Sequence, residues 1–445
     1  MLTNGAMYQN DISSGFPPHS EASSVICDSE GNLLFYTNGE KLWDRSHQVM
    51  PHGDNLMGHF SSSQGALIVP QPESSRYFYV FTTDNAVLGS NVLENGFRYS
   101  VVDMCLNDSL GDIVTEKKNI LLLDTVAEKL SAVRHANGTD YWVIVHKYFS
   151  DAFYAYHLTS SGIEESVISK VGSLHPHPLA FQGFNGAVGQ LKFSPEGKML
   201  AIVTAGGGYN IAELFNFDNA TGLVSNCINL IRDSENQQCY GLSFSPDNSK
   251  LYMSCVSGSS DRLHQFNLVA GNGSPDAIIA SKTTISYAAF GLQLANNGKI
   301  YVSRSQTIHY LDVIHEPNNL GFACNLEDSA IYLQGRIASM GLPNFIDSYS
   351  YTNGTAGCME MPQKEEVTVP TVLTPDGDGI NDLFEVDNLP DGSHLVIYSR
   401  WGRKVYHAEN YANGWDAGNV TGGIYYYIFI LPDGEVRKGV VQVLK

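Results

Sequence analysis

Apolar and polar positions alternate along most of this 445-residue chain, in short runs separated by turn residues. One unit recurs: an apolar run, a tight Ser/Pro/Asp/Gly/Asn turn, and a second apolar run. Asp-Gly and Asn-Gly turns supply the positive φ angles that a tight reversal needs, so each unit predicts a β-hairpin. We expect hairpins at 25–39, 66–84, 132–148, 191–204, 242–255 and 292–304.

A further apolar run follows most of these hairpins and begins at residues 99, 154, 213, 264 and 309. A repeat of about fifty residues, made of strands and without helical periodicity, is typical of a propeller blade. The pattern predicts an all-β protein in which residues 1–349 form a β-propeller of seven blades, with six as the alternative. A strand at 339–349 should help to close the ring, although almost nothing precedes Leu2 to pair with it.

The alternation stops at 350–366, which predicts a linker. From residue 367 to residue 445 it resumes as six or seven short apolar runs. Runs of this length and spacing predict a small, separate, Ig-like β-sandwich.

Five stretches in this last block, TPDGDGINDLFEV, LVIYSRWGRKVYH, NGWDAG, GGIYYYIF and KGVVQVLK, resemble the gliding-motility-associated C-terminal domain, the type B sorting domain of type IX secretion cargo. Upstream, GNLLFYTNG, SSSQGALIVP, HANGTDYWVI, LKFSPEGK and GLPNF resemble the propeller module often joined to it. The residues that carry the sorting-domain motif are Thr374, Pro375, Asp376, Gly377, Asp378, Gly379, Asn381, Asp382, Arg400, Trp401, Gly402, Trp415, Asp416 and Tyr426.

The resemblance implies a secreted protein at the bacterial cell surface, associated with the outer membrane. Its implied partners are the type IX outer-membrane translocon and associated shuttle or anchor proteins. The propeller would bind an unknown surface protein or glycan. Members of the family normally carry a leader and a further strand before the LTNG stretch, whereas this sequence begins MLTNG, so it is expected to start late or to close its blades differently.

The acidic turn at 376–382 has two interpretations. Asp376 and Asp378 alternate as calcium ligands do, and Asp382 follows closely. Ile380, however, occupies a position where an EF-hand loop needs Asp or Asn. A Gly/Asp turn that leads into a strand is therefore favoured. A weak calcium site at the three aspartates is the alternative, and no other cofactor is expected.

A net charge of −20 and the lack of a Lys/Arg run make nucleic-acid binding an unexpected function. The seven cysteines include no CxxC pair, which argues against a zinc ribbon. Cys227 and Cys239 are the first candidates for a disulfide because a short loop separates them, and Cys255 is expected to be a small core residue.

The sequence contains no GxSxG, HExxH, Walker or strand-associated GxGxxG motif, so a non-catalytic binding protein is favoured. The alternative is a secreted propeller lyase or hydrolase with carboxylates in its central channel. His175 and His177 have the spacing of a metal pair but no recognisable further ligand, and His135 and His146 should hydrogen-bond within a blade. Trp401, Trp415 and Asp416 are expected to be core and turn residues, while one tyrosine of 425–427 should be exposed to a partner.

Overall fold

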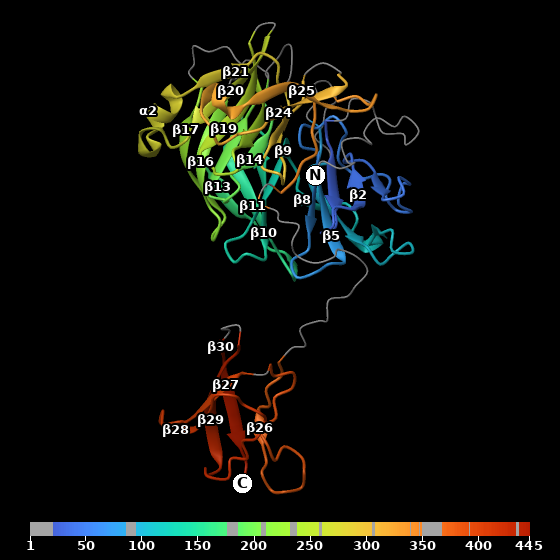
Figure 1. Ribbon diagram of the computed structural model, residues 1–445. Helices are drawn as coiled ribbons and strands as arrows, with labels where there is room; N and C mark the ends of the chain where they lie inside the picture. The colour runs from blue at the N-terminus through green and yellow to red at the C-terminus, as the bar shows by residue number, and fades with distance from the viewer. Residues whose placement is uncertain are drawn as a thin grey trace. The chain divides into compact units, whose positions relative to one another are not determined.

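The computed structural model describes residues 21–85, 95–175, 186–205, 211–231, 238–257, 260–304, 308–338, 340–346, 348, 367–390, 392–432 and 436–445. The chain divides into two compact units, Met1–Met361 and Pro362–Lys445 (Figure 1). The predicted linker at 350–366 lies outside the described residues. Among the described residues, no helix has both the length and the apolar character needed to cross a membrane.

The first three sheets of unit 1 are antiparallel and follow one another along the chain. Their strands are β1 (Ser24–Cys27), β2 (Leu33–Thr37) and β3 (Leu42–Asp44); β4 (Ala66–Pro70), β5 (Tyr77–Thr83), β6 (Phe97–Asp103), β7 (Asp112–Ile113) and β8 (Ile120–Leu123); β9 (Val126–Arg134), β10 (Tyr141–Lys147), β11 (Ala152–Thr159), β12 (Gly162–Ile163) and β13 (Val167–Lys170). A 3-10 helix, η2 (Thr115–Lys117), lies between β7 and β8.

Three further antiparallel sheets complete the described part of unit 1. Their strands are β14 (Leu191–Phe193), β15 (Met199–Val203), β16 (Ala212–Asp218) and β17 (Leu223–Asn229); β18 (Gln238–Phe244), β19 (Lys250–Ser257), β20 (Ser260–Asn267) and β21 (Thr283–Ser286); β22 (Leu292–Leu294), β23 (Ile300–Val302), β24 (Tyr310–Ile314) and β25 (Leu326–Tyr332). The short helices are η3 (Ala270–Gly273), α2 (Pro275–Ala280) and η4 (Gly321–Cys324).

Every predicted hairpin is present as an antiparallel pair, from β1–β2 to β22–β23. The first strands of successive sheets are neighbours in the order β1, β4, β9, β14, β18, β22, which is the arrangement of a β-propeller. The all-β propeller prediction is therefore confirmed. The described residues contain six such sheets, and the number of blades stays a prediction.

The end of unit 1 meets its beginning. The backbone N–H of Asn344 donates to the carbonyl of Ser23 at 2.7 Å, and the hydroxyl of Ser24 donates to the carbonyl of Asn344 at 2.9 Å. On the other side, the hydroxyl of Ser303 donates to the carbonyl of Met340 at 2.8 Å. The strand predicted at 339–349 is wrong in one respect, because residues 340–346 form no regular strand; the segment nevertheless joins the sixth sheet to β1.

A buried polar network surrounds Asn344. Its side-chain amide donates to the carbonyl of Leu130 at 2.9 Å and accepts from Lys192 Nζ at 3.1 Å. Lys192 Nζ also donates to Gln293 Oε1 at 2.8 Å. The partners of Asn344 and Lys192 come from β9 and β22, Lys192 itself from β14, and all are buried, so polar groups of three sheets are held together by hydrogen bonds that satisfy one another.

Unit 2 is a five-stranded sheet with a segment folded against one face, which gives it a sandwich-like form. The sheet order is β26-β30-β29-β27-β28, with the strands β26 (Val372–Leu373), β27 (His394–Ser399), β28 (Lys404–Ala408), β29 (Gly423–Ile430) and β30 (Val436–Val443). One of the short apolar runs expected to form strands, at 383–390, is not a regular strand. Phe384 and Val386 are buried in the core, and the Asn413 side chain takes the place of a strand partner by bonding both backbone groups of Val386.

The disulfide prediction is corrected by the structure. Cys239 on β18 and Cys255 on β19 lie directly opposite each other and form a disulfide, whereas Cys227 on β17 is free and exposed. Cys255 is therefore not a simple core thiol. Cys105 is disulfide-bonded as well. Such bonds persist in oxidising compartments, which agrees with a protein that functions outside the cytosol.

Candidate functional site

The sheet of unit 2 exposes apolar side chains on the face opposite its core. Along β29 the side chains alternate, so that Tyr425 and Phe429 are buried while Tyr426 is 47% exposed and Ile424 and Ile430 are exposed too. The sequence expectation that one tyrosine of this run faces outward agrees with this alternation.

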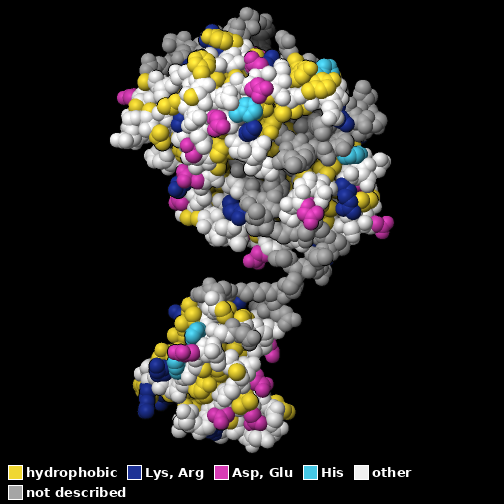
Figure 2. Space-filling model, in the orientation of Figure 1, with side chains coloured by type: hydrophobic (Ala, Val, Ile, Leu, Met, Phe, Trp, Pro, Cys, Tyr) yellow, Lys and Arg dark blue, Asp and Glu magenta, His cyan; other side chains and the backbone are white. Residues whose placement is uncertain are grey.

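Strand β30 extends the same surface. Val440 lies opposite Tyr426 and Val436 lies opposite Ile430, and both valines are exposed. We call Ile424, Tyr426, Ile430, Val436 and Val440 the apolar outer face. Figure 2 shows hydrophobic side chains gathered on this unit. Lys438 lies between the two valines on the same side of β30. Exposed apolar side chains on two adjacent strands are unfavourable in water, so this face is a candidate interaction site.

The acidic turn at 376–382 is stabilised by hydrogen bonds between the Asp382 side chain and backbone N–H groups of the same turn. The carboxylate of Asp382 accepts hydrogen bonds from the N–H groups of Gly377 and Gly379, both at 2.7 Å, and these bonds lower the pKa of Asp382. Both glycines have φ of +86°, a conformation in which a side chain would be strained. The Gly/Asp composition is thus what this loop geometry requires.

Other motif residues complete the turn. The N–H of Thr374 donates to the carbonyl of Asn381 at 2.8 Å, and the half-buried Pro375 lies between them in the loop. Carboxylate oxygens of Asp376, Asp378 and Asp382 lie within 4.8 Å of one another. Exposed acidic groups are often this close without an ion, so calcium binding here stays a prediction.

The two tryptophans of the motif have different positions. Trp415 is buried in the core against Phe384, whereas Trp401 is 82% exposed at the β27–β28 turn, with the Arg400 guanidinium 4.9 Å above its ring. Gly402 closes that turn with φ of +76°, and Asp416 accepts the N–H of Gly418 at 2.8 Å. Trp415 and Asp416 thus lie in core and turn, and Trp401 is a turn residue that also presents a ring to solvent.

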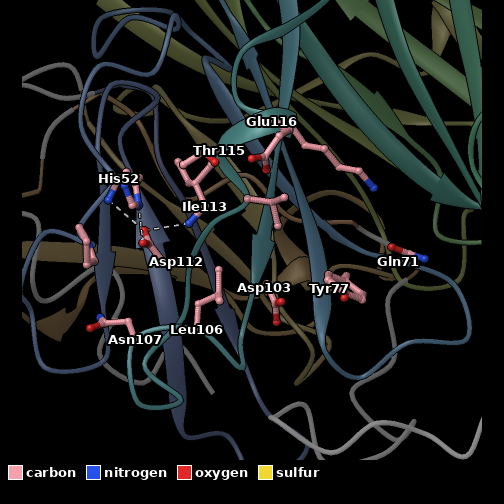
Figure 3. Close-up of a pocket in the computed structure, with 13 residues that line it drawn as sticks. His52, Gln71, Tyr77, Asp103, Leu106, Asn107, Asp112, Ile113, Thr115 and Glu116 are labelled. Carbon is pink, nitrogen blue, oxygen red and sulfur yellow. Dashed lines mark hydrogen bonds and ion pairs between the residues drawn. The ribbon is translucent and has the colours of Figure 1, made fainter.

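Unit 1 contains a pocket of about 720 Å³ beside the second sheet (Figure 3). Its wall is formed by the ends of β5, β6 and β7, the helix η2, and the loop that follows β3. Tyr77, Leu106 and Ile113 give it apolar surface, and Gln71 and other side chains give it hydrogen-bonding groups; the remaining lining residues include Pro51, Asn107, Val114, Thr115, Glu116 and Lys117.

A histidine–aspartate pair lies in this pocket. His52 Nδ1 is 2.7 Å from Asp112 Oδ2, and the backbone N–H groups of His52 and Ile113 donate to Asp112 Oδ1 at 2.9 and 2.8 Å. The Asp112 side chain is nearly buried, while the His52 side chain is 53% exposed. The carboxylate therefore fixes the imidazole, whose exposed ring can reach a ligand.

A second carboxylate of the pocket is already neutralised. The Arg76 guanidinium donates two hydrogen bonds of 2.7 Å to the Asp103 carboxylate, and the backbone N–H of Cys105 donates a third at 2.9 Å. Burial raises the pKa of Asp103, but these bonds outweigh burial and leave its pKa below the ordinary value. Glu116 and Lys117 of η2 are exposed in the same pocket, which therefore offers a fixed imidazole, amides and an aromatic ring together with one carboxylate and one ammonium group.

Sequence reasoning missed this pocket because its residues come from separate turns. His52 and Asp112 are sixty residues apart, and neither belongs to a motif with known spacing. The sequence instead draws attention to the spacing of His175 and His177. His175 is fully buried and its ring stacks on His146 at 3.9 Å, while His177 lies outside the described residues. The expectation that His146 hydrogen-bonds within its blade is wrong for Nδ1, which has no partner.

Comparison with known proteins identifies the C-terminal unit. Residues 367–443 match the family model of the CHU_C type IX secretion signal domain. No curated protein matches the chain. A type IX secretion signal marks a chain for export, so this protein is a type IX secretion cargo that goes to the cell surface or the extracellular space and interacts with the secretion machinery.

Solved structures resemble the chain only distantly. A Bacteroides uniformis protein provisionally described as a 6-phosphogluconolactonase has 14% identity and a TM-score of 0.43, covering 73% of this chain and 86% of its own. Hydrazine synthase of Kuenenia stuttgartiensis has 13% identity and a TM-score of 0.41, and the match covers 66% of this chain and 76% of that protein. PorZ, a type IX secretion component of Porphyromonas gingivalis, has 12% identity and a TM-score of 0.34, and the match covers 89% of this chain and 61% of that protein. Similarity this low assigns no activity, ligand or partner.

Proposed function

We propose that the type IX secretion signal at 367–443 is recognised as a folded surface, and that the propeller it delivers is a non-catalytic binding module. The observation that carries the proposal is the apolar outer face on β29 and β30, the two longest strands of the signal domain. Its partner in the export step would be the outer-membrane translocon or an associated shuttle or anchor protein.

The apolar outer face suits a docking role for a physical reason. Exposed Tyr426 and Val440 lie opposite each other, so a partner can cover both at once, and apolar burial stabilises a contact by about 25 cal/mol per Å². Tyrosine is also enriched among residues that dominate binding energy. A folded face can be recognised only while the sheet is intact, which makes the export signal dependent on the domain's fold.

The test replaces Tyr426 and Val440 with serine in the full chain, which changes the exposed face and leaves the core side chains in place. Ile380→Ser is the matched control, because Ile380 is an exposed apolar residue in the acidic turn. The double variant should reach the surface about tenfold less, since the lost contact exceeds about 1.4 kcal/mol. Normal export of a folded double variant would contradict docking through this face.

For the propeller, the pocket beside β5 and β7 supports a hydroxyl-rich ligand such as a surface glycan. A tyrosine ring with amide and imidazole groups around it is the mixture of apolar wall and directed polar groups that small-ligand sites use. Screening the full chain against immobilised glycans should give a signal that Gln71→Ala and Tyr77→Ala reduce. An unchanged signal in both variants would place glycan binding elsewhere.

The His52–Asp112 pair favours a second candidate, a secreted propeller hydrolase or lyase. An imidazole oriented by a carboxylate is the arrangement that general acid–base catalysis uses. In this alternative His52→Gln would abolish turnover of a polysaccharide while leaving ligand binding largely in place. Binding without turnover by the unaltered protein would support the non-catalytic module.

A further inference from the structure

Three metal-ligating side chains meet at one end of the third sheet. His135 follows β9 and Asp140 precedes β10, so they stand at the two ends of the β9–β10 turn, which the N–H of His135 closes by donating to the carbonyl of Asp140 at 2.8 Å. His157 lies on β11, directly opposite Trp142 of β10. Turn geometry and strand register therefore bring together residues that the sequence separates.

The three side chains are within reach of one small ion. One ligand atom from each of His135, Asp140 and His157 lies within 4.8 Å of the other two. His157 Nε2 is 3.1 Å from Asp140 Oδ2, and the side chains of these two residues are only 18% and 15% exposed. The rings of His135 and His157 stand 4.6 Å apart. Two imidazoles and a carboxylate thus converge at a partly buried point.

The orientation of His157 leaves a nitrogen without a hydrogen bond. Its Nδ1 is 2.9 Å from Glu164 Oε2, and because a carboxylate only accepts, Nδ1 carries the proton of the neutral ring. In this neutral form Nε2 holds a lone pair. This atom is buried and makes no hydrogen bond, yet it lies next to the carboxylate of Asp140. Two carboxylates thus flank one imidazole, and a lone pair at Nε2 would repel Asp140, so either a second ring proton or a bound cation lies at Nε2.

We propose that His135, Asp140 and His157 bind one divalent transition-metal ion, with zinc as the first candidate. Imidazole nitrogen suits zinc and its neighbours in the series, whereas calcium and magnesium prefer sites made of oxygen alone. Three protein ligands leave a fourth tetrahedral position for water. Glu164, by accepting the Nδ1 proton, would hold His157 in the metal-binding tautomer, the role that second carboxylates play at zinc sites.

A metal ion bound here would connect the β9–β10 turn to strand β11. His135 now accepts the N–H of Asn137 at Nδ1, 3.0 Å away, and contacts the carbonyl of Ala220 through Nε2 at 3.3 Å. Ligation replaces one of these contacts with a stronger bond, so metal binding should tighten the β9–β10 turn against β11. The ring of Trp142 also stacks on the His157 imidazole, with 4.8 Å between the ring centroids, and so helps to hold that ligand in position.

The test uses the full chain without an affinity tag, stripped with a chelator and then given one equivalent of Zn²⁺ or Co²⁺. Retained metal is counted after gel filtration, and Co²⁺ absorption in the visible reports tetrahedral ligation. The unaltered protein should retain one ion per chain and unfold at a higher temperature with metal than without. His135→Gln and Asp140→Asn should abolish both effects, and Glu164→Gln should weaken affinity about 10- to 100-fold.

His315→Gln is the matched control. His315 Nε2 makes a similar contact with Glu327, at 2.8 Å, but among the described residues this pair belongs to no three-ligand group. The control should bind metal like the unaltered protein. Absence of bound ion in the unaltered protein, or equal binding in all variants, would overturn the proposal and leave His157 as a protonated ring bridging Asp140 and Glu164. Melting curves of the metal-free variants show whether each one folds.

Discussion

Two stacked imidazoles show how strongly this fold controls individual residues. His146 and His175 are fully buried, and burial together with the nearby Lys129 lowers the pKa of His146 to about 3. The pKa of His175 is lowered as well, first by burial and then by His146. Both rings are therefore neutral at every pH at which the protein is expected to work, and their unpaired nitrogens destabilise the fold.

This burial predicts an acid-sensitive stability. Because the folded pKa of His146 is depressed, the unfolded state binds more protons below about pH 6.5, and stability is lost as the pH falls from there towards 3. By pH 5.5 the loss should be about 1.4 kcal/mol per histidine. Urea unfolding at pH 7.5 and 5.5 measures it. His146→Phe should lose roughly half of the pH dependence, and an unchanged dependence would assign it to other groups.

Asp382 carries the next prediction at this scale. Since both of its oxygens accept glycine N–H groups, Asp382→Asn should lower the melting temperature of unit 2, with or without calcium. Thermal melts with and without millimolar Ca²⁺ distinguish the two interpretations of the turn. A rise in melting temperature with calcium in the unaltered protein, missing in Asp382→Asn, would favour a calcium site over a plain turn.

At the scale of elements, the sequence predicted what local signals determine. Each hairpin has its turn residues between its two apolar runs, and every predicted hairpin is present. The disulfide partner of Cys239 could not be predicted in the same way, because the choice between Cys227 and Cys255 depends on which strands share a sheet. Likewise, the alternation in GIYYYIFI shows that β29 has two apolar faces, but only packing decides which one is buried.

The position of β30 within its sheet determines what removing the C-terminal residues 439–445 would do to unit 2. It pairs with β29 on one side and with β26 on the other, so it is an inner strand, not an edge. A chain that ends at residue 438 loses the buried Val441 and Val443 together with these pairings. Calorimetry should show the transition of unit 2 disappear while that of unit 1 remains, and this chain should not be exported. A persisting second transition would contradict the assigned topology.

The pocket residues illustrate what no local pattern contains. His52 follows the first sheet, whereas Asp112 begins β7 of the second, and their contact arises only because the two sheets are neighbours. His135, Asp140 and His157 meet by strand register in the same way. Fold class was therefore accessible from the sequence, and the side-chain clusters were not.

For the whole molecule, net charge limits the partners. At −20 the chain repels polyanions over distances longer than any single contact, and no cluster of Lys and Arg in the sequence offsets this. We expect no retardation of duplex DNA or single-stranded RNA in gels at physiological salt. Retardation that weakens steeply with added salt would show a basic surface that the sequence does not reveal.

The central claim is that the folded domain at 367–445 is the address for export, read through its apolar outer face. It is tested by joining a leader and an unrelated folded reporter to 367–445, and measuring the reporter at the surface of a host that exports the native chain. The intact domain should carry the reporter outward, and the same fusion with Tyr426→Ser and Val440→Ser should leave most of it in the periplasm. A reporter that stays in the periplasm although its attached domain is intact and folded would contradict the claim.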